Sequence, residues 1–559
     1  MAGPFPSVRT LPQVLEASAR QFPDRPCLAG PGEAPMTYRE VAEAVRTLSH
    51  LLRTKGIAFG DKVAILAENC PQWGIAYFAV VSMGAVAVPI LTEFHADAVI
   101  HILRHSEARA VFVSEKLFPK LEGASLDPAP LCFNLETFSP MTLDISRDTL
   151  RDLRQAGLRE FRRWMGKALG EGAPAEPSAE DLAALIYTSG TTGHSKGVML
   201  THGNIVANLR AVFTIVPATG QDRFLSLLPL AHTFEATLGL VYPLACGASV
   251  HYLGKAPTSR VLLPALAAVR PTVVLSVPLV VEKIFKTAIL PNLAKTRFNR
   301  LLCRFSLTRS LISRLAGRKL LASFGGRLRI LAIGGAPLAA DAERFLREAR
   351  FPYAIGYGLT ETSPLLTGSS PAHTRLSSAG TILEGVELRI GSRNPKTGEG
   401  EIEVRGHNVM RGYYKLPELT AEVLSKDGWL RTGDLGSVSA DGYVFIKGRS
   451  KNVILGPSGE NIYPEEVESF FFASAYVQEV LVYAQDGRLT ARVYLDVDRT
   501  EEYFAAHADK TLADLLEGIR LEVNSRVSSF ARIHRMIEQT EPFEKTATKK
   551  IKRYLYVDQ

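Results

Sequence analysis

Cysteine is scarce in this sequence of 559 residues, which contains only Cys27, Cys70, Cys132, Cys246 and Cys303. The five are odd in number and scattered, and no two have a CxxC or other metal-ligand spacing. A disulfide framework or a structural zinc site needs paired or closely spaced cysteines. The sequence therefore argues against both, and it fits a reducing compartment such as the cytoplasm.

Leader-like and membrane-spanning features are also sparse. Residues 1–24 contain no basic stretch followed by an apolar one, so no signal peptide is expected. One uncharged run, residues 74–91 (GIAYFAVVSMGAVAVPIL), is about long enough to cross a bilayer. Because it contains two glycines, a serine and a proline, we favour a buried helix leading into a buried strand over a membrane span.

Low-complexity tracts, internal repeats and nucleic-acid-binding modules are absent from the sequence. The net charge is nonetheless +8, a balance that suits nucleic acids, membrane surfaces or anionic small molecules. Without a module or a pattern of stacking aromatic residues, nucleic acid is not expected as a partner. The composition is 46% hydrophobic and 22% charged, which is typical of a globular protein, and the length predicts three or four folding units.

Positive charge is concentrated in residues 295–319, which carry eight basic side chains and no acidic one. Apolar residues recur between them at helical spacing, which predicts a basic amphipathic helix. The basic residues are Lys295, Arg297, Arg300, Arg304, Arg309, Arg314, Arg318 and Lys319, and the apolar ones are Phe298, Leu301, Leu302, Phe305, Ile312 and Leu315. We hypothesise that segment 295–329 contacts an anionic membrane surface from the cytoplasmic side. The alternative is the solvated face of an ordinary surface helix.

Short uninterrupted apolar runs separated by helix-length segments dominate residues 36–390. Such runs predict strands buried on both faces, in largely parallel sheets covered by helices. The runs are 62–68, 85–91, 108–114, 182–189, 223–230, 247–253, 271–278 and 328–335. From about residue 386 the pattern changes to shorter strands with turns, at 385–391, 400–406 and 442–448.

A new unit begins after GRSKN at 448–452, with a helical segment at 464–472 and strands at 477–485 and 488–496. The sequence therefore predicts an α/β fold in two parts. The large N-terminal domain, 1–448, contains stacked mixed or parallel sheets with helices and a β-rich subdomain at about 386–448. The second part, 449–559, is a small α+β C-terminal domain.

Residues 186–204 (IYTSGTTGHSKGVMLTHGN) place hydroxyl side chains, glycines and Lys196 directly after a strand. Glycines let the backbone approach a bulky anion, hydroxyls donate to phosphate oxygens, and lysine adds a mobile positive charge. The stretch predicts a polyphosphate cradle, although it does not follow the GxxxxGK[ST] spacing of a P-loop. A polar surface turn is the alternative reading.

Three later stretches strengthen the nucleotide interpretation. LAIGGAPL (331–338) ends a strand in two glycines, where a flat ring could lie on the backbone. AIGYGLTET (354–362) supplies Tyr357, suited to stacking on a base, and Glu361, suited to holding Mg²⁺. DGWLRTGDLG (427–436) places Asp434 in an expected tight turn, suited to ribose hydroxyls. A core tyrosine and a solvated glutamate are the alternatives.

Taken in order, six stretches resemble the adenylate-forming (AMP-binding, acyl-CoA synthetase-like) superfamily. They are YTSGTTGHSKGV (187–198), GGAPL (334–338), YGLTET (357–362), GWLRTGDLG (428–436), GRSKNVI (448–454) and TATKKIKR (546–553). The resemblance covers nearly the whole chain. It implies activation of a carboxylate with Mg-ATP to an acyl-adenylate and pyrophosphate, followed by transfer of the acyl group to a thiol, usually that of coenzyme A (CoA).

The resemblance also implies roles for individual residues. The β- and γ-phosphates would be held by Thr188, Ser189, Gly190, Thr191, Thr192 and Lys196, Mg²⁺ by Thr188 and Glu361, and the α-phosphate by Thr360. The adenine slot would consist of Gly335, Ala336, Pro337, Gly356, Tyr357 and Gly358, and the ribose would be held by Asp434 and Arg449.

Lys550 resembles the catalytic lysine, which bridges the carboxylate and the α-phosphate. The family usually reads T-x-T-G-K, whereas position 549 is lysine here, so a merely basic tail is the alternative. In this family the small domain rotates between the two half-reactions. Lys451 would lie at the hinge, and Gly459, Glu460 and Asn461 would meet the incoming thiol.

LPLAHTFE (228–235) is similar to the long-chain fatty acyl-CoA synthetase branch. The similarity implies that His232 lies by the acyl carboxylate, with Phe234 and Gly335 along the acyl group; a buried structural histidine is the alternative. No aspartate follows the aromatic, which disfavours amino-acid substrates. We therefore expect a cytoplasmic fatty acid–CoA ligase. A ligase that acylates a carrier protein's phosphopantetheine is the nearest alternative, and a non-catalytic lipid- or nucleotide-binding homologue is a remote one.

Overall fold

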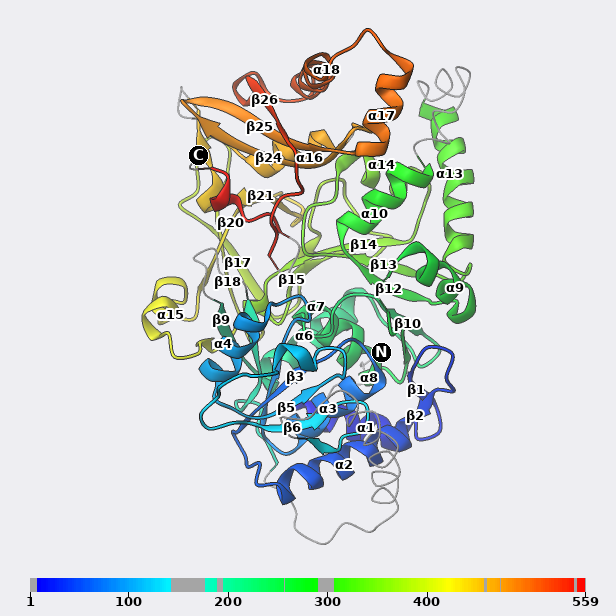
Figure 1. The fold of residues 1–559 in the computed structure, drawn as a ribbon, viewed down its shortest axis with the longest axis vertical. Helices are drawn as coiled ribbons and strands as arrows, with labels where there is room; N and C mark the ends of the chain where they lie inside the picture. Colours follow the sequence, from blue (N-terminus) through cyan, green and yellow to red (C-terminus); the bar gives the residue numbers. More distant parts are fainter. Residues whose placement is uncertain are drawn as a thin grey trace.

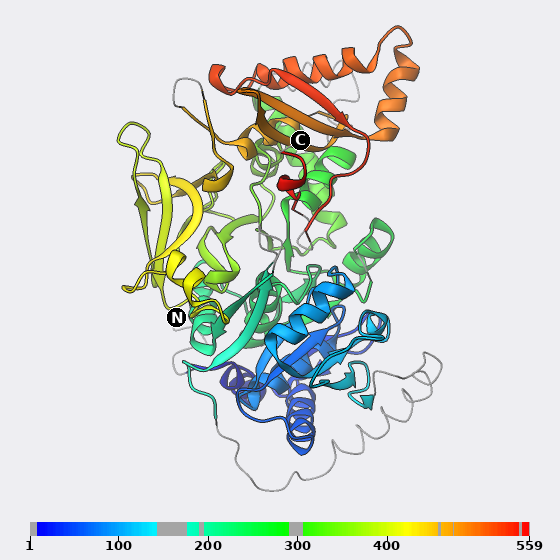
Figure 2. The same cartoon turned by 60° about the vertical axis from the view of Figure 1, so that its left-hand side comes forward.

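The computed structural model describes residues 8–141, 176–188, 195–255, 257–289, 306–456, 460–472, 474–546 and 550–557. Its architecture is mixed α/β, as predicted. Two large sheets with helices form the body in the lower part of Figure 1, and the C-terminal unit lies above them. Figure 2 shows the small sheet around residues 386–449, drawn in yellow, projecting to one side of this body.

The first large sheet has eight strands in the order β19-β9-β8-β4-β3-β5-β6-β7. Its centre, β8-β4-β3-β5-β6, is parallel, and the predicted runs at 62–68, 85–91, 108–114 and 182–189 supply four of these five strands. The bounds are β3 (Lys62–Leu66), β4 (Val86–Pro89), β5 (Ala108–Val113), β6 (Leu131–Asn134), β7 (Pro140–Met141), β8 (Leu182–Thr188), β9 (Lys196–Thr201) and β19 (Gly412–Tyr413).

The second large sheet has nine strands in the order β16-β15-β14-β13-β12-β10-β11-β1-β2. Strands β14 through β1 run parallel in this order, and the four remaining predicted runs form β10 to β13. The bounds are β1 (Pro26–Ala29), β2 (Met36–Thr37), β10 (Arg223–Ser226), β11 (Ser249–Tyr252), β12 (Val273–Ser276), β13 (Ile330–Ile333), β14 (Tyr353–Gly358), β15 (Leu365–Gly368) and β16 (Thr381–Ile382).

The uncharged run at 74–91 is a buried helix followed by a buried strand, as predicted. Helix α3 (Pro71–Ser82) has apolar residues on every side, and residues 74–81 within it are buried, as is the whole of β4. A helix that is apolar all round belongs in a protein core. None of the helices in the described part of the chain is long and apolar enough to span a membrane.

The other helices of the body pack on these sheets or connect their strands. The α-helices are α1 (Leu11–Gln21), α2 (Tyr38–Thr54), α4 (Ala96–Ser106), α6 (His202–Ile215), α7 (Thr233–Glu235), α8 (Tyr242–Ala245), α9 (Ser259–Val269), α10 (Pro278–Ile284), α13 (Ser306–Ser323), α14 (Ala340–Glu348) and α15 (Pro417–Val423). Short 3₁₀ segments are η1 (Phe118–Lys120) and η4 (Thr360–Thr362), and η2 (Ala236–Val241) and η3 (Phe285–Ile289) are π-helical.

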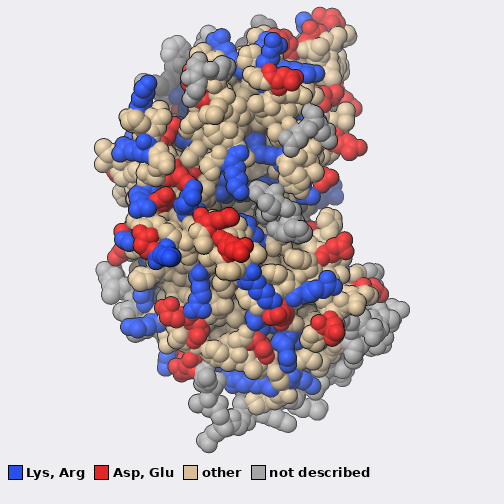
Figure 3. Space-filling model, turned by 90° about the vertical axis from the view of Figure 1, so that its left-hand side faces the viewer, with Lys and Arg blue, Asp and Glu red and all other residues tan. Residues whose placement is uncertain are grey.

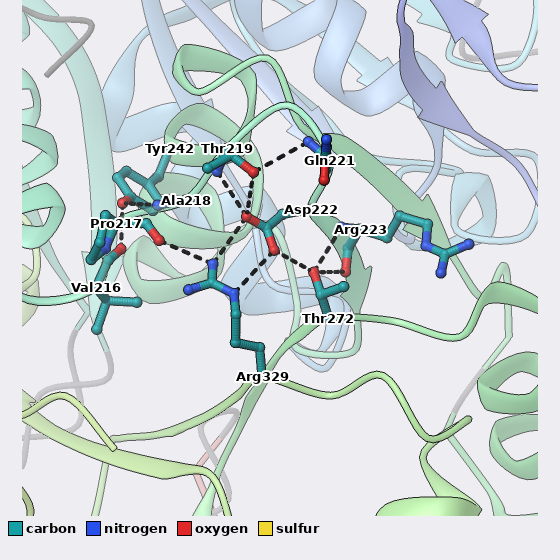
Figure 4. Close-up of polar contacts among 10 residues, drawn as sticks. All are labelled: Val216, Pro217, Ala218, Thr219, Gln221, Asp222, Arg223, Tyr242, Thr272 and Arg329. Carbon is teal, nitrogen blue, oxygen red and sulfur yellow. Dashed lines mark hydrogen bonds and ion pairs between the residues drawn. The ribbon is translucent and has the colours of Figure 1, made fainter. Parts of the chain in front are cut away.

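A buried polar network ties the amino ends of the parallel strands together. Asp222, immediately before β10, accepts hydrogen bonds from Thr272 (2.7 Å) and Thr219 N–H (2.7 Å), and it pairs with Arg329 (2.9 Å), as Figure 4 shows. Thr272 and Arg329 precede β12 and β13. Ligands of open α/β sheets bind at the carboxyl ends of the strands. The network therefore stabilises the end of the sheet away from the expected site.

The smaller sheet and the C-terminal unit follow. The smaller sheet consists of four antiparallel strands, β17 (Val386–Gly391), β18 (Gly400–Gly406), β20 (Leu430–Val438) and β21 (Val444–Arg449). The C-terminal unit has its own hydrophobic core, which includes Val467, Phe471 and Val482. Its elements are η5 (Ser450–Asn452), β22 (Ile454–Leu455), β23 (Asn461–Ile462), α16 (Pro464–Phe471), β24 (Val477–Gln485), β25 (Arg488–Leu495), α17 (Val497–Ala506), α18 (Leu512–Asn524), η6 (Ser529–Ala531), β26 (Arg535–Gln539) and η7 (Arg553–Leu555).

The predicted basic helix is described from Ser306 onward, as α13. Residues 290–305 lie outside the described residues, and with them Lys295, Arg297, Arg300, Arg304 and the apolar residues Phe298, Leu301, Leu302 and Phe305. Elsewhere on the surface, Figure 3 shows basic and acidic side chains interspersed over the face that it draws.

Candidate active site

The predicted site residues gather where strands of both large sheets end. Thr188 closes β8, Gly334 and Gly335 follow β13, and Tyr357 lies near the carboxyl end of β14. Asp434 and Arg449 come from the neighbouring strands β20 and β21. This is the edge of an α/β sheet at which ligands bind.

Lys196 and Glu361 are joined through Tyr413. The Lys196 ammonium lies 4.5 Å from the centroid of the Tyr413 ring, and the Tyr413 hydroxyl donates to Glu361 Oε1 at 2.9 Å. Burial lowers the pKa of Lys196 below its usual value, while the Glu361 carboxylate opposes this shift. Burial likewise raises the pKa of Tyr413 well above its usual range. The Lys196 ammonium and the Glu361 carboxylate are thus both held by Tyr413, one by its ring and the other by its hydroxyl.

The cradle stretch starts and ends on a strand pair. Thr188 pairs with Lys196 across the antiparallel strands β8 and β9. Ser189, Gly190, Thr191 and Thr192 lie outside the described residues. The two ends of the predicted cradle are therefore side by side, with Lys196 beside Glu361.

Asp434 is at the centre of a second charge cluster. Its carboxylate accepts from the Tyr357 hydroxyl at 2.7 Å and pairs with Arg449 Nε at 2.9 Å. Only 4% of Asp434 is exposed, and burial raises the pKa of its carboxyl while Arg449 lowers it. The sequence suggested a tight turn here, but Asp434 lies within strand β20. The residue before it, Gly433, has φ at +69°, a backbone conformation that glycine adopts without strain.

Glycines allow neighbouring segments to pack closely against the backbone beside these clusters. A side chain at Gly358 would place its Cβ 1.9 Å from the Pro364 carbonyl oxygen, and one at Gly356 would lie 3.0 Å from Leu365. Gly335 has φ at +91°, and a Cβ added at its neighbour Gly334 would lie 3.3 Å from Phe234 Cζ. The Phe234 ring therefore packs against the backbone immediately before Gly335. Ala336, Pro337 and Thr360 lie on the same two strand-end segments.

His232 begins helix α7 as its N-cap. Its Nδ1 accepts the Phe234 N–H at 3.2 Å, so the neutral ring carries its proton on Nε2. Burial lowers the pKa of His232 to about 4, and the positive charge of Lys550 acts in the same direction. The ring is therefore uncharged near neutral pH and keeps one N–H donor for another group.

Lys550 comes from the C-terminal unit. Figure 1 shows the red terminal segment descending from that unit toward the middle of the molecule. The side chain is solvent-exposed, yet desolvation by the surrounding protein and the charge of Arg449 lower its pKa, while Asp434 and Glu361 raise it. Lys550 therefore lies within electrostatic range of Glu361, Asp434, Arg449 and His232.

The predicted thiol-side residues are not part of these clusters. Lys451 is exposed in η5, although its charge contributes to lowering the pKa of Lys196. Glu460 and Asn461 lie on the β22–β23 hairpin, where the Gly456 N–H donates to the Glu460 carbonyl at 2.8 Å. Gly459 lies outside the described residues.

Sequence reasoning missed Tyr413, which connects Lys196 to Glu361. The residue lies in RGYYKLPELT (411–420), a stretch without a glycine-rich or charged pattern to draw notice. Its importance comes from pairing of β19 with β9, two segments more than 200 residues apart in the sequence. A site with lysines from two units, a carboxylate, and a buried Asp434 paired with the half-buried Arg449 suits reactions between anions. The fold is that of the adenylate-forming enzymes.

Residues 15–414 match the family described as AMP-binding enzyme, and the chain belongs to that family. Long-chain-fatty-acid–CoA ligase FadD15 of Mycobacterium bovis is 32% identical over 472 residues, covering 80% of this chain and 75% of that protein. Long-chain-fatty-acid–CoA ligase 5 of Rattus norvegicus is 29% identical over 528 residues, covering 87% and 74%. The Arabidopsis thaliana long-chain-fatty-acid–[acyl-carrier-protein] ligase AEE15 is 27% identical over 553 residues, covering 86% and 75%.

Solved structures share the fold. The anthranilate CoA ligase AuaEII with anthranoyl-AMP aligns with a TM-score of 0.79 at 23% identity, covering 99% of this chain and 97% of that one. The Bacillus subtilis o-succinylbenzoate CoA synthetase with ATP and a magnesium ion aligns at 0.72 and 22% identity, covering 97% and 98%.

Proposed function

We propose that this ligase activates a long-chain fatty acid with ATP and transfers the acyl group to CoA. In the first half-reaction a carboxylate oxygen attacks the α-phosphorus, forming the acyl–phosphate bond as the bond to pyrophosphate breaks. In the second, the thiol sulfur attacks the acyl carbon and loses its proton. The carbon–sulfur bond forms, and AMP leaves. Both the carboxylate and the phosphates are anions, so the site has to offset their repulsion.

The observation that carries the proposal is the position of Lys550. A lysine from the C-terminal unit lies within electrostatic range of both His232 and Asp434. If the acyl carboxylate lies by His232 and the ribose by Asp434, then Lys550 would be close to both reactants. It would neutralise charge at both the carboxylate and the α-phosphate. The names of the curated relatives support a long-chain fatty acid as substrate.

Magnesium fits the site as a partner of the nucleotide. Within the described residues, no three His, Cys, Asp or Glu side chains gather as a ready-made metal site. Mg²⁺ commonly binds through one or two carboxylates plus substrate phosphates, and Glu361 with the Thr188 hydroxyl provides such a set. When bound, the ion would reduce the negative charge of the phosphates. Lys196 would do so from the other side of the Tyr413 ring.

Carboxylate-dependent ATP–pyrophosphate exchange tests the proposal, because this exchange needs no thiol. It should require a fatty acid and Mg²⁺, and a series of chain lengths should reveal the preferred acid. Lys550→Ala should lose most of the exchange. Lys552→Ala is the matched control, since Lys552 pairs with Glu544 at 3.1 Å. Absence of exchange with every fatty acid would overturn the proposal.

The acceptor is the finer part of the proposal. The residues around Lys550 serve a CoA thiol or a carrier-protein phosphopantetheine equally well, and relatives of both kinds are similar to this chain. Turnover measured with CoA and with acyl carrier protein separates the two. A higher kcat/KM with the carrier protein would favour the alternative.

An anionic membrane surface is the proposed source of the fatty acid. Helix α13 has no acidic residue, and Leu311 and Leu315 on it are 60% and 53% exposed next to exposed Arg314 and Arg318. Apolar and basic side chains on one helix face suit a lipid interface. Co-sedimentation with anionic phospholipid vesicles should weaken in Leu311→Ser/Leu315→Ser. The control is Leu521→Ser on α18, which is 57% exposed. Equal binding by both variants would contradict this source.

A further inference from the structure

Behind His232 lies a buried polar cluster formed by Asn69, Ser226 and Glu235, which we call the Asn69 cluster. Asn69 follows β3 in one large sheet, whereas Ser226 ends β10 in the other. Asn69 Nδ2 donates to Ser226 Oγ at 2.9 Å, and Ser226 Oγ donates to Glu235 Oε1 at 2.6 Å. The cluster thus connects the two sheets directly beneath the loop that ends at His232.

The Asn69 cluster holds that loop by its backbone. Asn69 Nδ2 donates to the Leu228 carbonyl at 2.6 Å, and Asn69 Oδ1 accepts the Leu230 N–H at 2.8 Å. The His232 carbonyl accepts the N–H groups of Glu235 and Ala236, both at 3.0 Å. The backbone is therefore fixed both before and after His232.

Glu235 is an unusual side chain for a core. It is fully buried, and its Oε2 has no hydrogen-bond partner among the described residues. Burial raises the pKa of its carboxyl to about 8, so the group is mainly neutral at pH 7. Gly239 in the π-helix η2 leaves room for it, because a Cβ at Gly239 would lie 2.6 Å from Glu235 Cδ. Such local π-helices occur frequently at functional sites.

From this geometry we propose that Asn69, Ser226 and Glu235 are positioning residues, which fix the His232 ring where it meets the acyl carboxylate. The inference rests on the proposed function and deepens it, because it assigns a role to three residues that do not touch the substrate. If it is correct, losing the cluster weakens use of the fatty acid and leaves ATP binding unchanged.

The test compares Asn69→Ala, His232→Ala and the double variant in fatty-acid-dependent pyrophosphate exchange. Each single variant should lower kcat/KM for the fatty acid about tenfold or more, with KM for ATP within about twofold of wild type. Asn69→Ala removes three hydrogen bonds, and His232→Ala removes the ring itself. Because Asn69 acts through His232, the double variant should be no worse than His232→Ala alone. Glu235→Gln, which keeps the acceptor without a charge, should retain activity that Glu235→Ala loses.

A second readout does not depend on activity. Hydrogen exchange of the peptide spanning residues 226–234 should accelerate in Asn69→Ala, because the Leu230 N–H loses its acceptor, while exchange in the C-terminal unit stays unchanged. Unchanged exchange in this peptide would overturn the inference, and so would additive losses in the double variant or a His232→Ala variant with wild-type kinetics. A wild-type protein without any exchange of pyrophosphate would overturn the proposed function itself.

Discussion

Replacing Tyr413 by phenylalanine isolates one hydrogen bond at the junction of Lys196 and Glu361. The variant keeps the ring that lies 4.5 Å from the Lys196 ammonium and removes the hydroxyl that donates to Glu361 at 2.9 Å. A hydrogen bond to a charged group contributes roughly 1.5–3 kcal/mol. If Glu361 must be held for the reaction, this loss corresponds to a rate reduction of roughly 10- to 150-fold. Tyr413→Ala should cost more, because the contact with Lys196 disappears as well.

Pyrophosphate exchange measured at saturating fatty acid, across a range of Mg²⁺ concentrations, is the assay. Tyr414→Phe is the matched control, because the adjacent hydroxyl donates to Glu107 at 3.2 Å instead of to Glu361. Tyr413→Phe should raise the Mg²⁺ concentration needed for half-maximal activity, while Tyr414→Phe should not. Equal kinetics for the two variants, with Tyr413→Phe correctly folded, would refute the role assigned to Tyr413.

Three further predictions concern stability and the C-terminal unit. Asp222→Ala should lower the free energy of unfolding by roughly 2–3 kcal/mol, because it leaves Arg329 and Thr272 without their shared partner, and KM for ATP should be unchanged. His202 is fully buried, its Nδ1 accepts the Leu11 N–H at 3.2 Å, and burial lowers its pKa to about 4. The unfolded chain takes up this proton near pH 6.5, whereas the folded protein takes it up only near pH 4. The free energy of unfolding should therefore fall by up to ~3 kcal/mol as the pH drops from about 6.5 toward 4. Urea titrations should show a smaller fall in His202→Gln. Arg526, two residues beyond the end of α18, pairs with Asp341 of α14 at 3.1 Å. Arg526→Met should therefore slow pyrophosphate exchange about two- to threefold, as expected for an exposed ion pair. Thioester formation from supplied acyl-adenylate should not slow with it.

The strands of both large sheets could be predicted because parallel strands buried on both faces appear in the sequence as continuous apolar runs. The runs at 62–68 and 328–335, for instance, correspond to β3 and β13. Asp434 shows where local reasoning fails. A glycine-rich polar stretch favours a turn, but ladders to β18 and β21 hold these residues extended. Tertiary pairing outweighed local propensity.

The residues of the candidate site also fall into two groups, those that the sequence alone reveals and those that only the structure reveals. Lys196, Glu361, Asp434 and Lys550 stand in short stretches with a recognisable order of residue types, so the sequence alone nominates them. Asn69 and Tyr413 stand in ordinary stretches and acquire their contacts only through partners far away in the chain. Asn69 reaches Leu228 across 159 positions, and Tyr413 reaches Glu361 across 52. No local pattern records such a pairing.

Arg449 ends strand β21, and the 3₁₀ turn that leads into the C-terminal unit begins with the next residue, Ser450. The side chain proposed to grip the ribose is therefore attached directly to the pivot about which the unit would swing. A rotation at this point would move Arg449 and with it a bound ribose, and a bound ribose would in turn resist the rotation. Nucleotide binding and the orientation of the C-terminal unit, which carries Lys550, would then be coupled through the peptide bond between Arg449 and Ser450.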